Sequence, residues 1–377
     1  MSYKNFMRTY PQFERYFTEW QVTAYLLCVT LSRMSIAGRN KADGRKIMKI
    51  LHIGREENME RYPAPDYIAE EIETVSLPMG KRPEDYLDAM EEAQVIVADA
   101  MADVPGALIR KMPHLKMIHS EVVAYNRIDM KTAKEREIYV CNCRGMNASA
   151  VAEQTVFLMQ GMLKNVLLND RGVREGRQIQ IKEGYMVRGD LKELSDCKAG
   201  LIGLGDIGKS TAALLAAYHT ETYYYKRHPL SKEEEKQYKV TYLPLEKLLE
   251  TCDIISLHLP VTEETQGMCD KNFFGKMKEG AYFVNTSRGE LVDDQALIDA
   301  LKAGKLSMAA LDTLSHEPVQ KDHILLRQPE EIRNKLLFSP HIGGITASSF
   351  RRGYAMIWEN VGRILRGEKP MNVVNEK

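Results

Sequence analysis

The order of apolar and amphipathic segments constrains the fold of this chain more than any other feature of its sequence. From Met48 onward, short apolar runs of strand length alternate with longer, charged segments of helical character. The runs that we predict to be strands are 48–54, 95–100, 117–120, 139–142, 199–203, 222–225, 253–259, 281–286, 308–314 and 336–342. The helical segments between them include 82–92, 209–218, 245–252 and 294–303. Repeated strand–helix–strand units favour parallel sheets that are covered by helices on both faces, so the sequence predicts an α/β fold.

A long helical pattern, from Ala148 to about Asn169, separates the first four strands from the other six. With 377 residues, the chain is long enough to form two hydrophobic cores, one for each set of strands. Residues 1–47 fit neither set, because they are rich in aromatic and basic side chains and show no sustained period. We expect this segment to be a poorly structured N-terminal extension, without which a chain starting at Met48 still folds and remains active.

Composition argues against several classes of partner. The 52 Lys and Arg residues balance the 52 Asp and Glu residues, which gives no electrostatic case for nucleic-acid binding. The most apolar early run, 22–31, is about half the ~20 residues needed to span a bilayer, so we expect no membrane segment. The six cysteines lack the spacing of a metal site or a disulfide framework. Reduced cysteines are typical of a reducing compartment, and we expect a cytoplasmic protein without a metal.

The second set of strands opens with a glycine-rich turn, Gly203-Leu204-Gly205-Asp206-Ile207-Gly208. This turn follows an apolar strand and precedes a helix rich in Ala and Leu, which is the context that the dinucleotide-binding fingerprint requires. Gly203 permits a tight turn, Gly205 lets a pyrophosphate approach the backbone, and Gly208 lets the helix pack against the strand. Asp206 and Ile207 open the helix, whose N-terminus offers free N–H groups to phosphate. The alternative is a purely structural strand–helix turn.

The end of the next strand bears on the choice of cofactor. NAD sites usually carry an acid there, which binds the ribose 2′-hydroxyl. Here the strand 222–225 ends in Lys226 and Arg227 instead, and a guanidinium can bind a 2′-phosphate in a bidentate manner. We therefore predict NADP, with NAD as the alternative in case both cations are only solvated loop residues.

Further motifs follow the glycine-rich turn in a fixed order. They are Ser256-Leu257-His258-Leu259-Pro260, Thr262-Glu263-Glu264-Thr265, Val284-Asn285-Thr286-Ser287-Arg288-Gly289, Asp312, Glu317-Pro318 and Pro340-His341-Ile342-Gly343-Gly344. In order and spacing, these motifs strongly resemble those of the D-isomer-specific 2-hydroxyacid dehydrogenase family. The resemblance covers about 48–377 and is most specific between Gly203 and Gly344.

The resemblance implies two doubly wound parallel-sheet domains with the active site in the cleft between them. A Rossmann-type cofactor domain would comprise 148–346, and a flavodoxin-like substrate domain would comprise 48–147 together with 347–377. The resemblance also implies a homodimer.

The resemblance further implies an NAD(P)-dependent enzyme that interconverts small 2-oxo acids and D-2-hydroxy acids. Arg288 would bind the substrate carboxylate, and His341 would act as acid and base. Glu317 would orient the His341 imidazole and favour its protonated form. Besides Gly203, Gly205, Asp206, Ile207, Lys226 and Arg227, the expected cofactor contacts are Leu259, Pro260, Thr265, Thr286, Ser287, Arg288, Asp312, His341 and Gly343. Taken singly, Arg288, Glu317 and His341 could each be an ordinary turn or loop residue.

The segment 120–129 departs from the family, which usually has a glycine near Ala124 and binds the substrate carboxylate there through backbone N–H groups. Val123 and Ala124 are the substrate-binding residues that this resemblance implies. Tyr125 is either a substrate contact or a packing residue. Two other functions stay open. One is a cofactor-sensing regulator on the same fold, and the other is a related dehydrogenase with a different donor, such as formate or a phosphonate.

Overall fold

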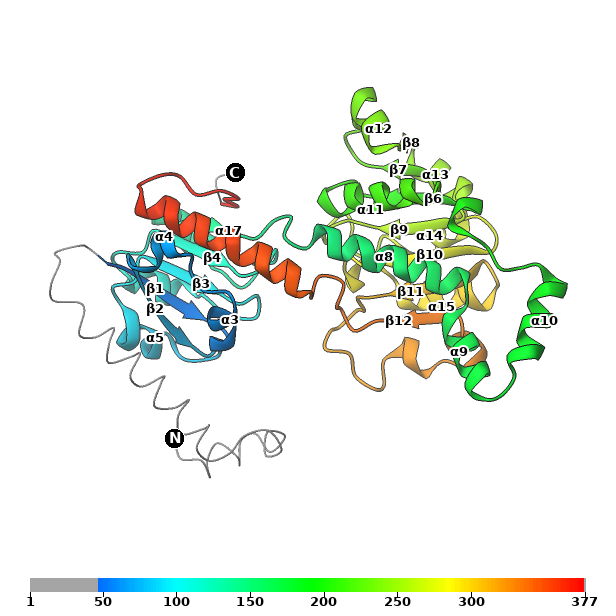
Figure 1. Ribbon diagram of the computed structural model, residues 1–377, viewed down its shortest axis with the longest axis horizontal. Helices are drawn as coiled ribbons and strands as arrows, with labels where there is room; N and C mark the ends of the chain where they lie inside the picture. The colour runs from blue at the N-terminus through cyan, green and yellow to red at the C-terminus, as the bar shows by residue number, and fades with distance from the viewer. Residues whose placement is uncertain (1–46, 376–377) are drawn as a thin grey trace.

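The computed structural model describes residues 47–375, and it contains two parallel sheets that lie in separate lobes (Figure 1). The predicted N-terminal extension, apart from its last residue, lies outside the described residues. No helix in the described part of the chain combines the length and apolar character that a membrane span requires.

The first sheet has five strands in the order β2-β1-β3-β4-β5, and every neighbouring pair is parallel. Its strands are β1 (Met48–Ile53), β2 (Ile72–Leu77), β3 (Val95–Ala98), β4 (Met117–Ser120) and β5 (Tyr139–Cys141). Its helices are α3 (Glu56–Arg61), α4 (Asp66–Ala69), α5 (Pro83–Met90), α6 (Gly106–Lys111), α7 (Met130–Glu135) and α17 (Ala347–Leu365). The sequence did not predict β2, because this edge strand is only half-buried and mixes apolar with polar side chains.

Two apolar clusters cover the two faces of this sheet. One joins alternate strand residues to α5, α6 and α7, and the other joins the remaining strand residues to α17. Thr346 caps α17 by accepting a hydrogen bond from the backbone N–H of Ser349. Through α17, the last helix of the chain completes the domain in which the first strand lies (Figure 1).

The second sheet has seven parallel strands in the order β12-β11-β10-β9-β6-β7-β8. They are β6 (Lys198–Ile202), β7 (Glu221–Tyr225), β8 (Thr241–Tyr242), β9 (Ile254–Leu257), β10 (Ala281–Asn285), β11 (Leu306–Leu311) and β12 (Leu336–Phe338). The helices of this lobe include α8 (Ala148–Leu163), α11 (Asp206–Ala217), α12 (Lys232–Tyr238), α13 (Leu245–Thr251), α14 (Lys271–Lys276), α15 (Asp294–Lys302) and α16 (Glu330–Arg333). Apolar clusters line both faces of the sheet. The predicted fold class, two parallel-sheet α/β domains, is confirmed.

The predicted long helix from Ala148 is shorter than expected. It ends at Leu163, and Asn165 then adopts a left-handed backbone with φ of 50°. The chain continues as α9 (Val166–Arg174) and α10 (Gln178–Arg188), which project from the second lobe (Figure 1). The periodicity continues across this break, so the sequence alone did not reveal it.

Candidate active site

The site residues proposed from the sequence share one position in the fold, just beyond the carboxyl ends of parallel strands. In the second lobe they follow β6 (Gly203, Gly205, Asp206, Ile207), β7 (Lys226, Arg227), β9 (Leu259, Pro260, Thr265), β10 (Thr286, Ser287, Arg288), β11 (Asp312, Glu317) and β12 (His341, Gly343). In the first lobe, Val123 and Ala124 follow β4. Ligands of open parallel sheets bind at this edge, next to the point where the strand order reverses.

The glycine-rich turn between β6 and α11 fits a bound pyrophosphate. Gly203 has a φ of 94°, and a Cβ there would lie 2.3 Å from the carbonyl oxygen of His258. A Cβ at Gly208 would lie 2.6 Å from the carbonyl oxygen of Gly203, whereas the space around Gly205 is open. Gly205 is the N-cap of α11 and no side chain caps the helix, so its first N–H groups remain available to phosphate oxygens.

Asp206 forms an ion pair that the sequence analysis did not anticipate. Its carboxylate accepts a hydrogen bond from Nε of Arg144, which lies in the segment joining β5 to α8, at a distance of 3.0 Å. A carboxylate at this helix N-terminus would by itself repel a pyrophosphate. Arg144 compensates that charge and brings a guanidinium close to the glycine-rich turn.

The cations predicted to select the cofactor lie at the end of β7. Arg227 is exposed and donates to Glu264 across a distance of 2.9 Å. Because both side chains are solvated, this ion pair is weak and can open to admit another anion. Glu221 lies at the opposite end of β7, where it interacts with Tyr223 and Lys198. No acid therefore occupies the end of this strand.

The loop after β9 is closed on itself by the side chain of Thr265. Its hydroxyl donates to the carbonyl oxygen of Pro260 at 2.8 Å and accepts from the backbone N–H of Thr262 at 2.8 Å. A Cβ on Gly203 would come within 3.0 Å of the Leu259 side chain, so the loop packs directly against the glycine-rich turn.

His341 and Glu317 form the dyad that the sequence predicted. Nδ1 of His341 lies 2.7 Å from a carboxylate oxygen of Glu317, and the other oxygen of Glu317 accepts from the backbone N–H of Leu314 at 3.0 Å. A carboxylate in this position holds Nδ1 protonated, which leaves Nε2 for proton exchange with a substrate. The His341 side chain is 46% exposed, so Nε2 remains accessible. His341 has a φ of 55°, a left-handed conformation that costs energy for a residue with a side chain.

Asp312 holds the loop that carries His341. One of its carboxylate oxygens accepts from the Ser339 hydroxyl and from the backbone N–H of Ile342, and the other accepts from the N–H of Gly343 at 2.9 Å. Asp312 is buried, and its carboxylate is saturated by these donors. The sequence pointed to a cofactor contact for Asp312, and that role stays a prediction, whereas its contacts here support the strained backbone of His341.

Arg288 stands on a turn that is anchored on several sides. The amide of Asn285 donates to the carbonyl oxygen of Arg288 and accepts from the N–H of Ser287, and the Ser287 hydroxyl donates to the carbonyl oxygen of Leu257. Thr286 shares a hydrogen bond of 2.8 Å with Thr155 of α8. The guanidinium of Arg288 is exposed and donates to the carbonyl oxygen of Ser287. Most of its N–H donors are therefore available to a ligand.

Gly289 brings the Arg288 turn against the loop of the dyad. A Cβ at this position would lie 1.9 Å from the carbonyl carbon of Leu314, whose N–H binds Glu317. No other residue type fits so close a backbone approach. Arg288 and Glu317 therefore lie on two loops that are in direct contact. His341 lies on a third loop, which is joined to the second by its hydrogen bond to Glu317.

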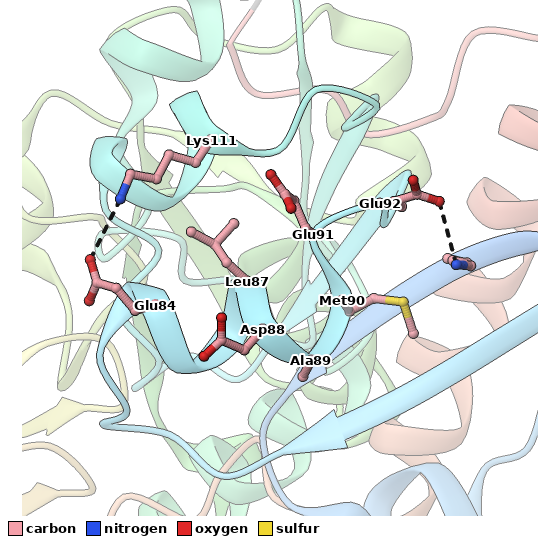
Figure 2. A pocket seen from close by; sticks show the side chains of 9 residues that line it. Glu84, Leu87, Asp88, Ala89, Met90, Glu91, Glu92 and Lys111 are labelled. Atoms are coloured by element: carbon pink, nitrogen blue, oxygen red, sulfur yellow. Dashed lines mark ion pairs between the residues drawn. The ribbon is translucent and has the colours of Figure 1, made fainter.

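A hollow of about 490 Å³ lies beside the dyad. Its lining includes Glu317, His341 and Asp312 together with apolar side chains such as Val319 and Phe338. A larger hollow, of about 620 Å³, lies next to α5 and is lined by Lys49, Lys111 and several carboxylates (Figure 2). That second hollow lies at the amino ends of the strands, away from every residue described above.

The substrate loop, 122–127, turns its carbonyl groups toward the protein. The Asn142 amide donates to the carbonyl oxygen of Val123 at 2.7 Å, and the Ser120 hydroxyl donates to that of Ala124 at 2.6 Å. The backbone N–H groups of Val123 and Ala124 make no hydrogen bond within residues 47–375, so they are free to donate to an anionic ligand. Tyr125 packs against the apolar cluster of its lobe, which favours the packing role among the two alternatives left open by the sequence.

Two buried histidines near this edge are poor proton donors. Burial lowers the pKa of His119 and that of His258 from 6.5 to about 4, so both imidazoles are neutral at physiological pH. His341 is the histidine at the strand ends that combines exposure with a carboxylate partner.

Comparison with known proteins gives consistent relatives. The sequence profile of the family described as "D-isomer specific 2-hydroxyacid dehydrogenase, NAD binding domain" matches residues 156–343. Dehydrogenase efuE of Hormonema carpetanum is 34% identical over 266 residues, which span 70% of this chain and 64% of that protein. Glyoxylate reductase of Korarchaeum cryptofilum is 33% identical over 292 residues, which span 77% of this chain and 85% of the reductase.

Solved structures share the fold. The crystal structure of a D-isomer specific 2-hydroxyacid dehydrogenase from Lactobacillus delbrueckii ssp. bulgaricus, in its NAD-complexed form, superposes with a TM-score of 0.73 at 24% identity. This alignment covers 87% of the present chain and 100% of the other.

Proposed function

The chain belongs to the D-isomer-specific 2-hydroxyacid dehydrogenase family, and we propose that it reduces small 2-oxo acids to D-2-hydroxy acids with NADPH as the preferred cofactor. The observation that carries this proposal is the pairing of His341 with Glu317, 2.7 Å apart, beside a hollow and next to the Arg288 turn. A regulator that only senses the cofactor does not require an exposed imidazole such as that of His341, whose strained backbone is supported by the buried Asp312.

The three residues divide the chemistry of carbonyl reduction. Arg288 binds the substrate carboxylate through the parallel N–H groups of its guanidinium and polarises the carbonyl oxygen. The bound reduced cofactor supplies a hydride to C2. His341, protonated, gives its Nε2 proton to the carbonyl oxygen as negative charge develops there, and in the reverse direction it removes that proton. Glu317 stabilises the imidazolium and fixes its orientation.

The two lobes are proposed to bind different ligands. We propose that the first sheet with α17 (48–147 and 347–377) is the substrate domain and that 148–346 is the cofactor domain. The free N–H groups of Val123 and Ala124 would hold the substrate carboxylate opposite Arg288. A homodimer and a cytoplasmic location stay predictions. The exposed apolar side chains of α9 and α10, which include Ile179, Met186 and Val187, offer a surface for a second copy.

A panel of oxo acids tests the function. Oxidation of NADPH and of NADH is followed with glyoxylate, hydroxypyruvate, pyruvate and phenylpyruvate. Formate and phosphite are tested as hydride donors, by following the reduction of NADP and of NAD. We expect turnover with at least one 2-oxo acid and none with formate or phosphite. Tight cofactor binding without turnover of any compound would instead identify a sensor.

The preference for NADPH should depend on Arg227. The Arg227→Ala variant loses the charge-assisted hydrogen bonds to the 2′-phosphate, so its ratio of kcat/KM for NADPH over NADH should fall by about tenfold or more. The matched control is Glu264→Gln, which frees Arg227 of its competing partner and should keep or strengthen the preference. An Arg227→Ala protein with an unchanged ratio would refute the assignment of this strand end.

A further inference from the structure

A carboxylate is buried at the start of the substrate loop. Glu121 follows β4 directly and is 1% exposed. One of its carboxylate oxygens lies 2.7 Å from Nε2 of His52 and also accepts the hydroxyl of Tyr354. Its other oxygen lies 3.4 Å from the amide nitrogen of Asn58. Nδ1 of His52 in turn lies 2.9 Å from the hydroxyl of Ser76 on the neighbouring strand.

These groups come from five separate segments of the first lobe. His52 is the last residue but one of β1, Asn58 lies on α3, Ser76 on β2 and Tyr354 on α17, and Glu121 follows β4. Because side chains alternate along a strand, His52 shares the face of Met48 and Ile50, which is the face that α17 covers. The carboxylate is thus enclosed between the end of the sheet and the helix.

A buried carboxylate destabilises a fold unless donors surround it. Here every polar atom of the group has a partner, and a fully satisfied network of this kind favours a single arrangement of its members. The donors also require close packing around them. A Cβ at Gly54 would lie 2.6 Å from Nε2 of His52, so the glycine leaves the space that the imidazole occupies.

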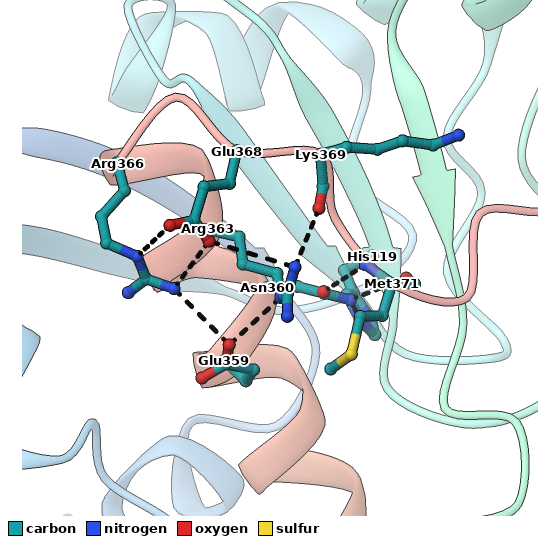
Figure 3. Close-up of polar contacts among 8 residues, drawn as sticks. All are labelled: His119, Glu359, Asn360, Arg363, Arg366, Glu368, Lys369 and Met371. Carbon is teal, nitrogen blue, oxygen red and sulfur yellow. Dashed lines mark hydrogen bonds and ion pairs between the residues drawn. The ribbon is translucent and has the colours of Figure 1, made fainter.

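A second contact ties the same strand to the same helix. His119 of β4 lies 3.1 Å from the amide nitrogen of Asn360, and Asn360 also bonds both backbone groups of Met371 in the C-terminal segment (Figure 3). This contact lies about 1.7 helical turns beyond Tyr354 along α17. It holds the body of the helix, whereas the Tyr354 contact reaches the loop itself.

Glu121 is the first residue after β4, so it stands where the substrate loop begins. The backbone N–H of Glu121 donates to the carbonyl oxygen of Ala98 at 2.8 Å, and the carbonyl groups of Val123 and Ala124 are then fixed by Asn142 and Ser120. These hydrogen bonds hold the backbone from which the free N–H groups of Val123 and Ala124 project. Tyr354 lies on α17, and this helix starts directly after the segment that carries His341.

We propose that Glu121 is a positioning residue for substrate binding: its buried carboxylate, held by His52 and Tyr354, orients the loop whose Val123 and Ala124 N–H groups bind the substrate carboxylate. This inference rests on the proposed function for the identity of the ligand. The orientation of the loop itself can be measured without turnover.

Two variants remove the network in different ways, and a third serves as a matched control. Tyr354→Phe deletes one hydroxyl and leaves the packing of the ring, while Glu121→Gln keeps the size and one acceptor but removes the charge. The control is Tyr86→Phe, which deletes the hydroxyl of an equally buried tyrosine on the opposite face of the same sheet, where it donates to the carbonyl oxygen of Pro78. Each protein is assayed for the KM of glyoxylate and hydroxypyruvate, the Kd of NADPH and the amide exchange of residues 117–130.

In Tyr354→Phe and Glu121→Gln, the KM of the oxo acid should rise by about tenfold while the Kd of NADPH changes less than about twofold. Amide exchange in 117–130 should accelerate in both variants. Tyr86→Phe should leave both the KM of the oxo acid and the amide exchange of 117–130 unchanged. Glu121→Ala should have a larger effect than Glu121→Gln, since the conservative variant keeps part of the network.

An unchanged KM and unchanged exchange in a folded Tyr354→Phe protein would overturn the proposal. So would an equal loss in Tyr86→Phe, because that result would indicate general destabilisation of the domain. If the wild-type protein reduces no 2-oxo acid, the proposed function fails, but the exchange measurement still decides whether Glu121 orients the loop.

Discussion

Replacing His341 with alanine is expected to lower kcat for 2-oxo acid reduction by about 10³-fold. The imidazole is the proton donor at the developing alkoxide, and general acid catalysis by a positioned side chain typically contributes between about 10² and 10⁴ in rate. The Kd of NADPH, measured by the fluorescence of the reduced nicotinamide, should change little. The phosphate-binding turn follows β6, whereas His341 follows β12. Steady-state kinetics with a saturating oxo acid provide the test.

The neighbouring His316 offers a matched control. It is exposed, and like His341 it has a left-handed backbone, with φ of 57° against 55°. A change to alanine therefore carries the same backbone cost at both positions. His316→Ala should retain nearly full kcat, and Glu317→Gln should fall between the two, since it keeps a hydrogen bond to Nδ1 but loses the charge. A His341→Ala enzyme with turnover close to that of His316→Ala would reject His341 as the acid.

Replacing Arg288 should have the second large effect. Arg288→Ala removes the guanidinium that binds the substrate carboxylate, and the loss of such preorganised donors lowers catalysis by about 10² to 10³. The expected result is a fall of that size in kcat/KM for the oxo acid. Arg288→Lys keeps the charge but not the parallel pair of donors, so it should recover only part of the loss.

Inhibition by oxalate separates binding from folding in these variants. Oxalate carries the same carboxylate as the substrate but accepts no hydride, so its inhibition constant against the oxo acid should rise along the series from wild type through Arg288→Lys to Arg288→Ala. The backbone contacts of Asn285 and Ser287, which shape the turn, do not involve the Arg288 side chain and should persist. An Arg288→Ala enzyme that oxalate inhibits as strongly as the wild type would contradict the assignment.

The sequence was informative wherever a local pattern determines the structure. Gly203 and Gly208 occupy positions where a Cβ would strike backbone, so the order of glycines reports a physical requirement of the turn. The alternation of apolar and helical segments predicted both parallel sheets, because repeated strand–helix–strand units favour this architecture. Arg288, Glu317 and His341 were individually unconvincing in the sequence. Their positions on adjoining loops at one edge of a sheet give them a common environment.

The features that the sequence did not reveal depend on contacts between distant segments. Arg144 meets Asp206 only because the chain passes from one lobe to the other beside α11. Glu121 reads as an ordinary loop acid in the sequence, yet it is buried by residues of β1 and α17. Asp312 was assigned to the cofactor by resemblance, and its hydrogen bonds to the His341 loop could not be inferred from spacing.

The stereochemistry of the product tests the central claim most directly. NADPH and each prochiral 2-oxo acid (hydroxypyruvate, pyruvate and phenylpyruvate) are incubated with the wild-type enzyme, and the product is resolved by chiral chromatography. We expect the D-2-hydroxy acid in an amount equal to the NADPH consumed, and about 10³-fold less product with His341→Ala in the same time. Formation of the L isomer, or consumption of NADPH without a 2-hydroxy acid, would contradict it.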